Sequence, residues 1–128
     1  MKRLLMKQLL KWKMSPRRKP LILRGVRQCG KTWLLKEFGK LHYDKTAYFN
    51  FESQPRLKNM FAGELDIVRI LTDLSAVHGE KITPGKTLII FDEIQECPVA
   101  LNSLKYFCEQ TPEYHIAAAG SLLGITIS

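Results

Sequence analysis

Short apolar runs alternate along the chain with longer segments in which apolar residues recur at helical spacing. The run at residues 87–91 (Thr-Leu-Ile-Ile-Phe) is apolar at nearly every position, which is typical of a strand covered on both faces of a parallel sheet. Three other runs, rich in apolar, aromatic or β-branched residues, predict strands at residues 21–23, 46–51 and 114–119. Strands that alternate with helices predict an α/β fold with a parallel sheet.

Helical periodicity predicts a helix after residue 32, which Gly39 is expected to help end. The residues expected on its buried side are Trp33, Leu34, Leu35 and Phe38. Three more helices are expected at residues 55–62, 64–77 and 98–110. Pro98 suits the first turn of the last one, because its ring fixes φ near the helical value and no N–H is needed there.

The first 14 residues predict a basic amphipathic helix, with an apolar stripe formed by Leu4, Leu5, Leu9 and Trp12. Ser15 and Pro16 break this helix and begin a short basic linker. We therefore expect a helix and linker over residues 1–18 and a core, truncated in this chain, over residues 19–128. The helix could pack its stripe on a neighbouring element, or its basic face could contact nucleic acid or a membrane surface.

Residues 25–32 (Gly-Val-Arg-Gln-Cys-Gly-Lys-Thr) match G-x-x-x-x-G-K-[ST], the phosphate-binding P-loop, between a predicted strand and a predicted helix. Phosphate oxygens need several backbone N–H groups at once, which glycines and a helix N-terminus can supply. We expect Lys31 to contact the β- and γ-phosphates and Thr32 to offer its hydroxyl to Mg²⁺. The predicted nucleotide-binding residues are Gly25, Val26, Arg27, Gln28, Cys29, Gly30, Lys31, Thr32 and Trp33.

Two acidic residues, Asp92 and Glu93, follow the apolar run at residues 87–91. Acids at the end of a central strand are costly to bury without a function, although an exposed acid pair is the simpler alternative. In P-loop enzymes the first acid at this place holds Mg²⁺ and the second polarises the attacking water. We expect Asp92 to share the metal site with Thr32, and Glu93 and Lys31 to be catalytic. Ser121, after the last predicted strand, is a third catalytic candidate as a γ-phosphate sensor, or else a plain turn serine.

Positive charge is concentrated in the first third of the chain. Residues 1–40 hold thirteen Lys and Arg against the single Glu37, a net charge of +12, whereas residues 41–128 carry −4. Part of the positive charge belongs to the phosphate site, so the surplus that needs another partner lies at residues 2–19. Such a surplus indicates a possible contact with nucleic acid.

Length and composition indicate the number of domains and the cellular environment of the protein. The 128 residues suit a single globular domain. Three cysteines without C-x-x-C spacing fit a reducing, cytoplasmic environment. No apolar run approaches the length of a membrane span, so we expect none.

With both motifs located, the chain resembles the AAA-type P-loop ATPases, and more closely a prokaryotic family whose ATPase part is followed by a C-terminal region of unknown function. The residues that carry the resemblance are 20–36, 92–95 and 120–121. The resemblance implies ATP and Mg²⁺ as cofactors, and ATP hydrolysis coupled to a conformational switch. It also implies a three-layer, mostly parallel P-loop sheet in the order 5-1-4-3-2. We expect four core strands here, in the order 1-4-3-2, with the fifth strand missing because it would lie beyond Ser128.

Two consequences follow from this resemblance. No arginine occurs after Arg69, so the late position usual for a sensing arginine has no candidate, and we expect weak turnover from this chain alone. A missing fifth strand would leave residues 21–23 at the sheet edge, which favours self-association or coverage by the tail at residues 122–127. Two other functions stay open: a nucleic-acid-binding module that uses residues 2–19, and a small-molecule P-loop kinase, for which a water-polarising Glu93 would be unnecessary.

Overall fold

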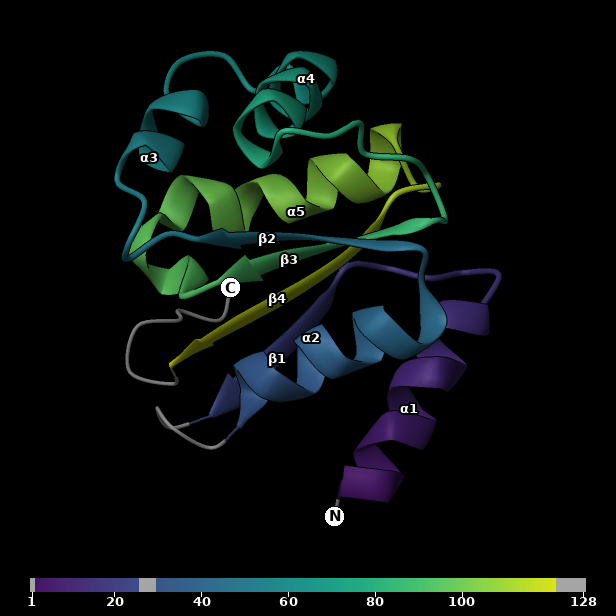
Figure 1. Ribbon diagram of the computed structural model, residues 1–128. Coiled ribbons are helices and arrows are strands. Elements are labelled where there is room, and N and C mark those ends of the chain that lie inside the picture. Colours follow the sequence, from purple (N-terminus) through teal and green to yellow (C-terminus); the bar gives the residue numbers. More distant parts are fainter. Residues whose placement is uncertain (1, 26–29, 122–128) are drawn as a thin grey trace.

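A computed structural model, which describes residues 2–25 and 30–121, contains a four-stranded parallel sheet between two layers of helices (Figure 1). The strands, in spatial order, are β1 (Leu21–Gly25), β4 (His115–Ser121), β3 (Thr87–Asp92) and β2 (Lys45–Asn50). One layer holds α1 (Lys2–Met14) and α2 (Lys31–His42). The other holds α3 (Arg56–Met60), α4 (Ile67–His78) and α5 (Pro98–Gln110). The predicted α/β class and the strand order 1-4-3-2 are confirmed.

The central strand β3 explains why the helices lie on both faces of the sheet. All six of its residues are buried, and it pairs with β2 on one side and β4 on the other. Ile89 and Phe91 belong to the core under α4 and α5, whereas Leu88 and Ile90 belong to the core under α2. A strand whose side chains alternate between two apolar cores requires cover on both faces, as its continuous apolar sequence predicts.

Two expectations for α2 are wrong. Trp33 is 51% exposed, whereas Leu34, Leu35 and Phe38 are buried as predicted. Gly39 is buried inside the helix, which continues to His42. A Cβ at Gly39 would overlap Thr46 Oγ1, so this glycine allows α2 to approach β2 closely and does not end the helix.

The helix α1 packs on α2 along a narrower stripe than the sequence predicts. Leu9 is buried, with Met6 and Trp12 partly buried beside it, but Leu4 and Leu5 are 61% and 38% exposed. The reason is that the contact with α2 follows positions 6, 9 and 12, so Leu9 and Trp12 of the predicted stripe take part in it and Leu4 and Leu5 lie to one side. Among the described helices, none is long and apolar enough to cross a bilayer. The division of the chain at residue 18 stays a prediction.

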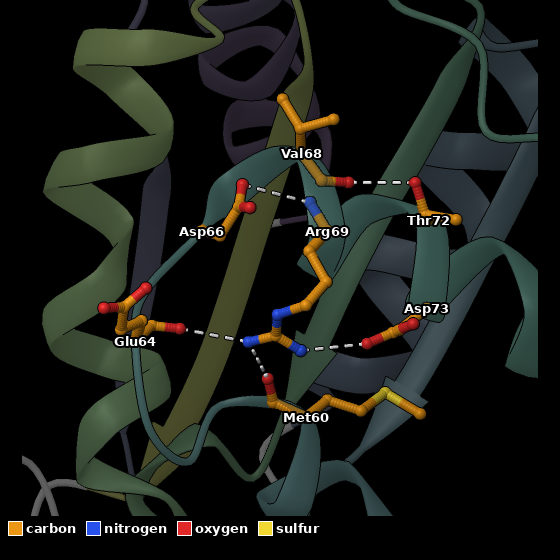
Figure 2. A network of polar contacts seen from close by, with 7 residues as sticks. All are labelled: Met60, Glu64, Asp66, Val68, Arg69, Thr72 and Asp73. Carbon is orange, nitrogen blue, oxygen red and sulfur yellow. Dashed lines mark hydrogen bonds and ion pairs between the residues drawn. The ribbon is translucent and has the colours of Figure 1, made fainter.

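Arg69 anchors the segment that joins α3 to α4 (Figure 2). Its guanidinium donates to the backbone oxygens of Met60 and Glu64, at 3.0 and 3.1 Å, and to the Asp73 carboxylate at 3.0 Å. The backbone N–H of Arg69 donates to Asp66 Oδ1, which caps the N-terminus of α4. One side chain therefore holds the preceding loop against the helix, and the planar fork of arginine allows the three contacts at once.

A buried pair of polar rings lies where α2 and β4 meet. The hydroxyl of Tyr43 is 2.6 Å from Nδ1 of His115, and both side chains are buried. Burial, together with the smaller effects of the nearby Arg18 and Lys13 cations, lowers the pKa of His115 from 6.5 to about 4. A neutral imidazole can accept the tyrosine hydrogen at Nδ1, whereas an imidazolium cannot accept it.

The His115 pair predicts a stability that depends on pH. Between pH 6.5 and about 4 the unfolded chain protonates this histidine and the folded chain does not. The free energy of unfolding therefore decreases as the pH falls through this window. The variant His115→Gln removes this contribution, so urea unfolding at a series of pH values should show a smaller loss in the variant than in the wild type. Equal losses in both proteins would contradict the assignment.

The Arg69 hydrogen bonds predict a loss of stability when the guanidinium is removed. Arg69→Met keeps the aliphatic stem but leaves three acceptors without their donor, so we expect the free energy of unfolding to drop by about 1–3 kcal/mol. Arg56→Met, on the exposed face of α3, is the matched control and should change it by less than about 0.5 kcal/mol. Urea unfolding measures both, and equal effects would argue against an anchoring role.

Candidate functional site

The carboxyl ends of the parallel strands meet the N-terminus of α2 at one edge of the sheet, on the left in Figure 1. In open α/β sheets this edge is the usual place for a ligand. Lys31 and Thr32 begin α2, and Asp92 and Glu93 end β3 or follow it. The fold thus brings together two sequence motifs that are about sixty residues apart.

Part of the predicted site lies outside the described residues. This holds for Val26, Arg27, Gln28 and Cys29, and for the side chain of Ser121, so their predicted roles stay predictions. Gly30 is described and has a φ of 80°, in the left-handed region that glycine adopts without strain. Among the described residues, apart from the chain neighbours, no atom lies within 4 Å of a Cβ placed at Gly30, so the constraint seen there is the backbone conformation.

Lys31 reaches from the first turn of α2 toward the end of β4. Its ammonium donates to the backbone oxygen of Gly120 at 3.0 Å. Gly120 stands in register with Arg24 of β1, so the lysine lies beside the junction of the two strands. The ammonium therefore lies at the carboxyl end of the sheet, where an anionic ligand would be attracted to it.

Thr32 and Asp92 join the two motifs directly. The threonine hydroxyl donates to Asp92 Oδ2 at 2.6 Å, and the backbone N–H of Glu93 donates to Asp92 Oδ1 at 2.9 Å. Asp92 as a whole is only 4% exposed, and burial of its carboxylate would be costly without such donors. A hydroxyl and a carboxylate this close are oxygen ligands of the kind that Mg²⁺ prefers, and Mg²⁺ usually takes its other ligands from water and phosphate. The residues present therefore fit that ion.

Glu93 follows in an unusual backbone conformation. Its φ of 52° and ψ of 43° make it the only non-glycine residue with a positive φ in the described part of the chain. Left-handed residues other than glycine are uncommon and concentrate at functional sites. Gln95, on the short 3₁₀ turn Ile94–Glu96, donates to Glu93 Oε2 at 3.1 Å. The predicted catalytic carboxylate is therefore held by its neighbour in the sequence.

Sequence reasoning missed two residues of this edge, Tyr48 and Asn50 of β2. The Tyr48 hydroxyl donates to Asp92 Oδ2 at 2.5 Å, and the Asn50 side chain donates to the Tyr48 hydroxyl at 3.1 Å. Burial and the bond to Asp92 raise the pKa of Tyr48 above its ordinary value. The available signal was the strand period of two, which puts residues 48 and 50 on one face at the end of a strand beside β3.

The comparisons with known proteins agree with this architecture. The family model described as "AAA domain" matches residues 17–128. The structure is also similar to that of C. elegans PCH-2, with a TM-score of 0.61 and 16% sequence identity, over 99% of this chain and 38% of that one. The chain thus spans well under half of the length of this structural relative, and the likeness shows the fold alone. No curated protein matched the chain in sequence. Because the family model covers most of the chain, the protein belongs to the AAA domain family.

Proposed function

We propose that this chain binds ATP with Mg²⁺ at the carboxyl edge of its sheet and supports slow hydrolysis. The observation that carries the proposal is the 2.6 Å hydrogen bond between Thr32 and Asp92, because it joins the end of the phosphate-binding motif to the acidic strand end. Lys31 stands beside this pair, so a cation, a hydroxyl and a buried carboxylate share one edge. Membership of the AAA domain family supports the same conclusion.

Each residue then has a role in this proposal. Backbone N–H groups of residues 25–33 and the ammonium of Lys31 would bind the phosphates, with the N-terminus of α2 adding its partial positive charge. Thr32 and Asp92 would hold Mg²⁺, which neutralises charge on the phosphates when bound. Glu93 would accept a proton from the attacking water, and Gln95 would keep its carboxylate in place. Ser121 remains the proposed γ-phosphate sensor.

The turnover of the isolated chain should be slow. Arginine fingers usually raise the rate by about 10³- to 10⁵-fold, and this sequence has no arginine after Arg69. Arg69 already donates to Asp73 on α4, to Met60 at the end of α3 and to Glu64 in the loop between them. We therefore propose that γ-phosphate contacts at the sheet edge act as a conformational switch for another part of the protein or a partner.

The site predicts different effects of two substitutions. Titration of ATP or GTP with Mg²⁺ against Lys31→Ala should show at least about 10-fold weaker binding, because the variant removes the phosphate-facing cation. Glu93→Gln keeps the shape of the side chain and should bind nucleotide as the wild type does while losing the residual hydrolysis. Lys40→Ala, on an exposed position of the same helix, is the control and should bind normally. Equal affinity of Lys31→Ala and wild type would refute the site.

A nucleic-acid contact is a second candidate function, and a basic groove favours it. Lys11, Arg17, Arg18 and Lys19 line a groove beside β1, with Trp12, Leu21 and Ile22 among its apolar members. Arg18 is already committed to the backbone oxygens of Lys13 and Pro112. The cations that remain to contact phosphates are therefore Lys11, Arg17 and Lys19.

This candidate predicts a salt-dependent mobility shift with single-stranded DNA or RNA. The triple variant with Lys11, Arg17 and Lys19 changed to Gln should abolish the shift while preserving the fold, because it spares Arg18. Changing the exposed Lys58, Lys81 and Lys105 to Gln alters the net charge equally and should leave the shift unchanged. The loss of binding in both variants would indicate a general charge effect and no specific groove.

Self-association is proposed through β1, the outer strand of the sheet on the side of β4. Within the described residues, β1 pairs with β4 on one side, and an apolar strand with an unpaired edge can pair with another chain. The apolar residues at this edge, Leu21 and Leu23, are only partly buried. The tail at residues 122–127, the alternative cover for this edge, lies outside the residues that the structure describes.

A further inference from the structure

The amide of Asn50 is held in one orientation by the turn that follows β2. Its oxygen Oδ1 accepts from the backbone N–H groups of Glu52 and Ser53, at 2.9 and 3.0 Å. Backbone N–H groups can only donate, so the oxygen side of the amide must face the turn. The nitrogen Nδ2 then faces Tyr48, whose hydroxyl oxygen is 3.1 Å away.

The orientation of Asn50 fixes the direction of the Tyr48 hydroxyl. The tyrosine oxygen accepts from Asn50 and therefore has its own hydrogen to donate. That hydrogen goes to Asp92 Oδ2, 2.5 Å away, because a carboxylate can only accept. The ammonium of Lys36 lies 3.9 Å from the centre of the Tyr48 ring and holds it from the α2 side. The result is a one-way chain of hydrogen bonds from the turn to the carboxylate.

Asp92 is thus fixed from three directions. Its Oδ2 accepts from Thr32 on α2 and from Tyr48 on β2, and its Oδ1 accepts from the N–H of Glu93. Asn50 stands opposite Asp92 in the register of β2 and β3, which explains why this neighbouring strand can reach the site. Removal of the Tyr48 hydroxyl would leave the tyrosine side of the carboxylate without its donor.

We propose that Tyr48 is a positioning residue for the Asp92 carboxylate at the Mg²⁺ site, and that Asn50 sets the direction of its hydroxyl. This inference rests on the proposed nucleotide site and adds a residue pair to it. Groups that orient a metal ligand typically contribute about 10- to 100-fold to metal affinity. The same chain of bonds ties the turn at residues 51–54 to the proposed metal site.

The experiment measures the affinity for ATP twice, once with Mg²⁺ and once with EDTA. The magnesium coupling is the dissociation constant in EDTA divided by the dissociation constant with Mg²⁺. Tyr48→Phe keeps the ring and deletes the hydroxyl, so it should lower the coupling by about 10-fold and leave the affinity in EDTA unchanged. Tyr106→Phe is the matched control, because this partly buried tyrosine of α5 also has a lysine near its ring. Its coupling should equal that of the wild type.

A second variant tests the chain of bonds itself. Asn50→Ala should lower the coupling in the same direction as Tyr48→Phe, and the double variant should be no worse than Tyr48→Phe alone, because both changes break one chain. An unchanged coupling in Tyr48→Phe would overturn the positioning role while the nucleotide site stands. This includes the case in which affinity falls equally with Mg²⁺ and with EDTA. Failure of the wild type to bind ATP in either condition would overturn the proposed function as well.

Discussion

The buried carboxylate of Asp92 is the constraint on which this edge of the protein depends. A charged group that is 4% exposed requires donors, and the structure supplies them from α2, from β2 and from the chain just after β3. Each donor must come from an element placed correctly against the others. The positions of α2 and β2 relative to β3 are therefore tied to the electrostatics of one side chain, and a shift of either element would leave a charge without a partner.

The sheet makes that placement possible through the size of its side chains. In β4, Ala117 and Ala119 face the core under α2, whereas Ala118 faces the core under α5. Small residues in a central strand let helices approach the sheet from both sides, and Gly39 does the same for the contact of α2 with β2. Bulky side chains fill the core under α4 and α5. There Phe51, Phe61 and Phe91 form mutual edge-to-face contacts with ring centres 5.5–6.0 Å apart.

The sequence was sufficient for features that depend on local pattern and insufficient for those that depend on pairing between distant elements. The apolar run of β3 and the alternation of elements were enough to predict a parallel α/β sheet, whereas the strand order came from the family resemblance. The exposure of Trp33, Leu4 and Leu5 could not be predicted, because helical periodicity gives a face but not the width of the partner that covers it. Tyr48 was missed for a similar reason: its role appears only once the register places β2 beside Asp92.

Glu93 shows how the same carboxylate shapes the backbone beyond the strand. A left-handed non-glycine residue costs on the order of 1–3 kcal/mol, so surrounding contacts must hold it. Its N–H binds Asp92 Oδ1, its side chain accepts from Gln95, and the next residue, Ile94, is fully buried. The turn thus has its ends fixed by the buried acid and by the core. In an extended strand, consecutive side chains such as those of Asp92 and Glu93 point to opposite faces of the sheet. Because the strand ends at Asp92 and the backbone turns at Glu93, this alternation does not apply to the two acids.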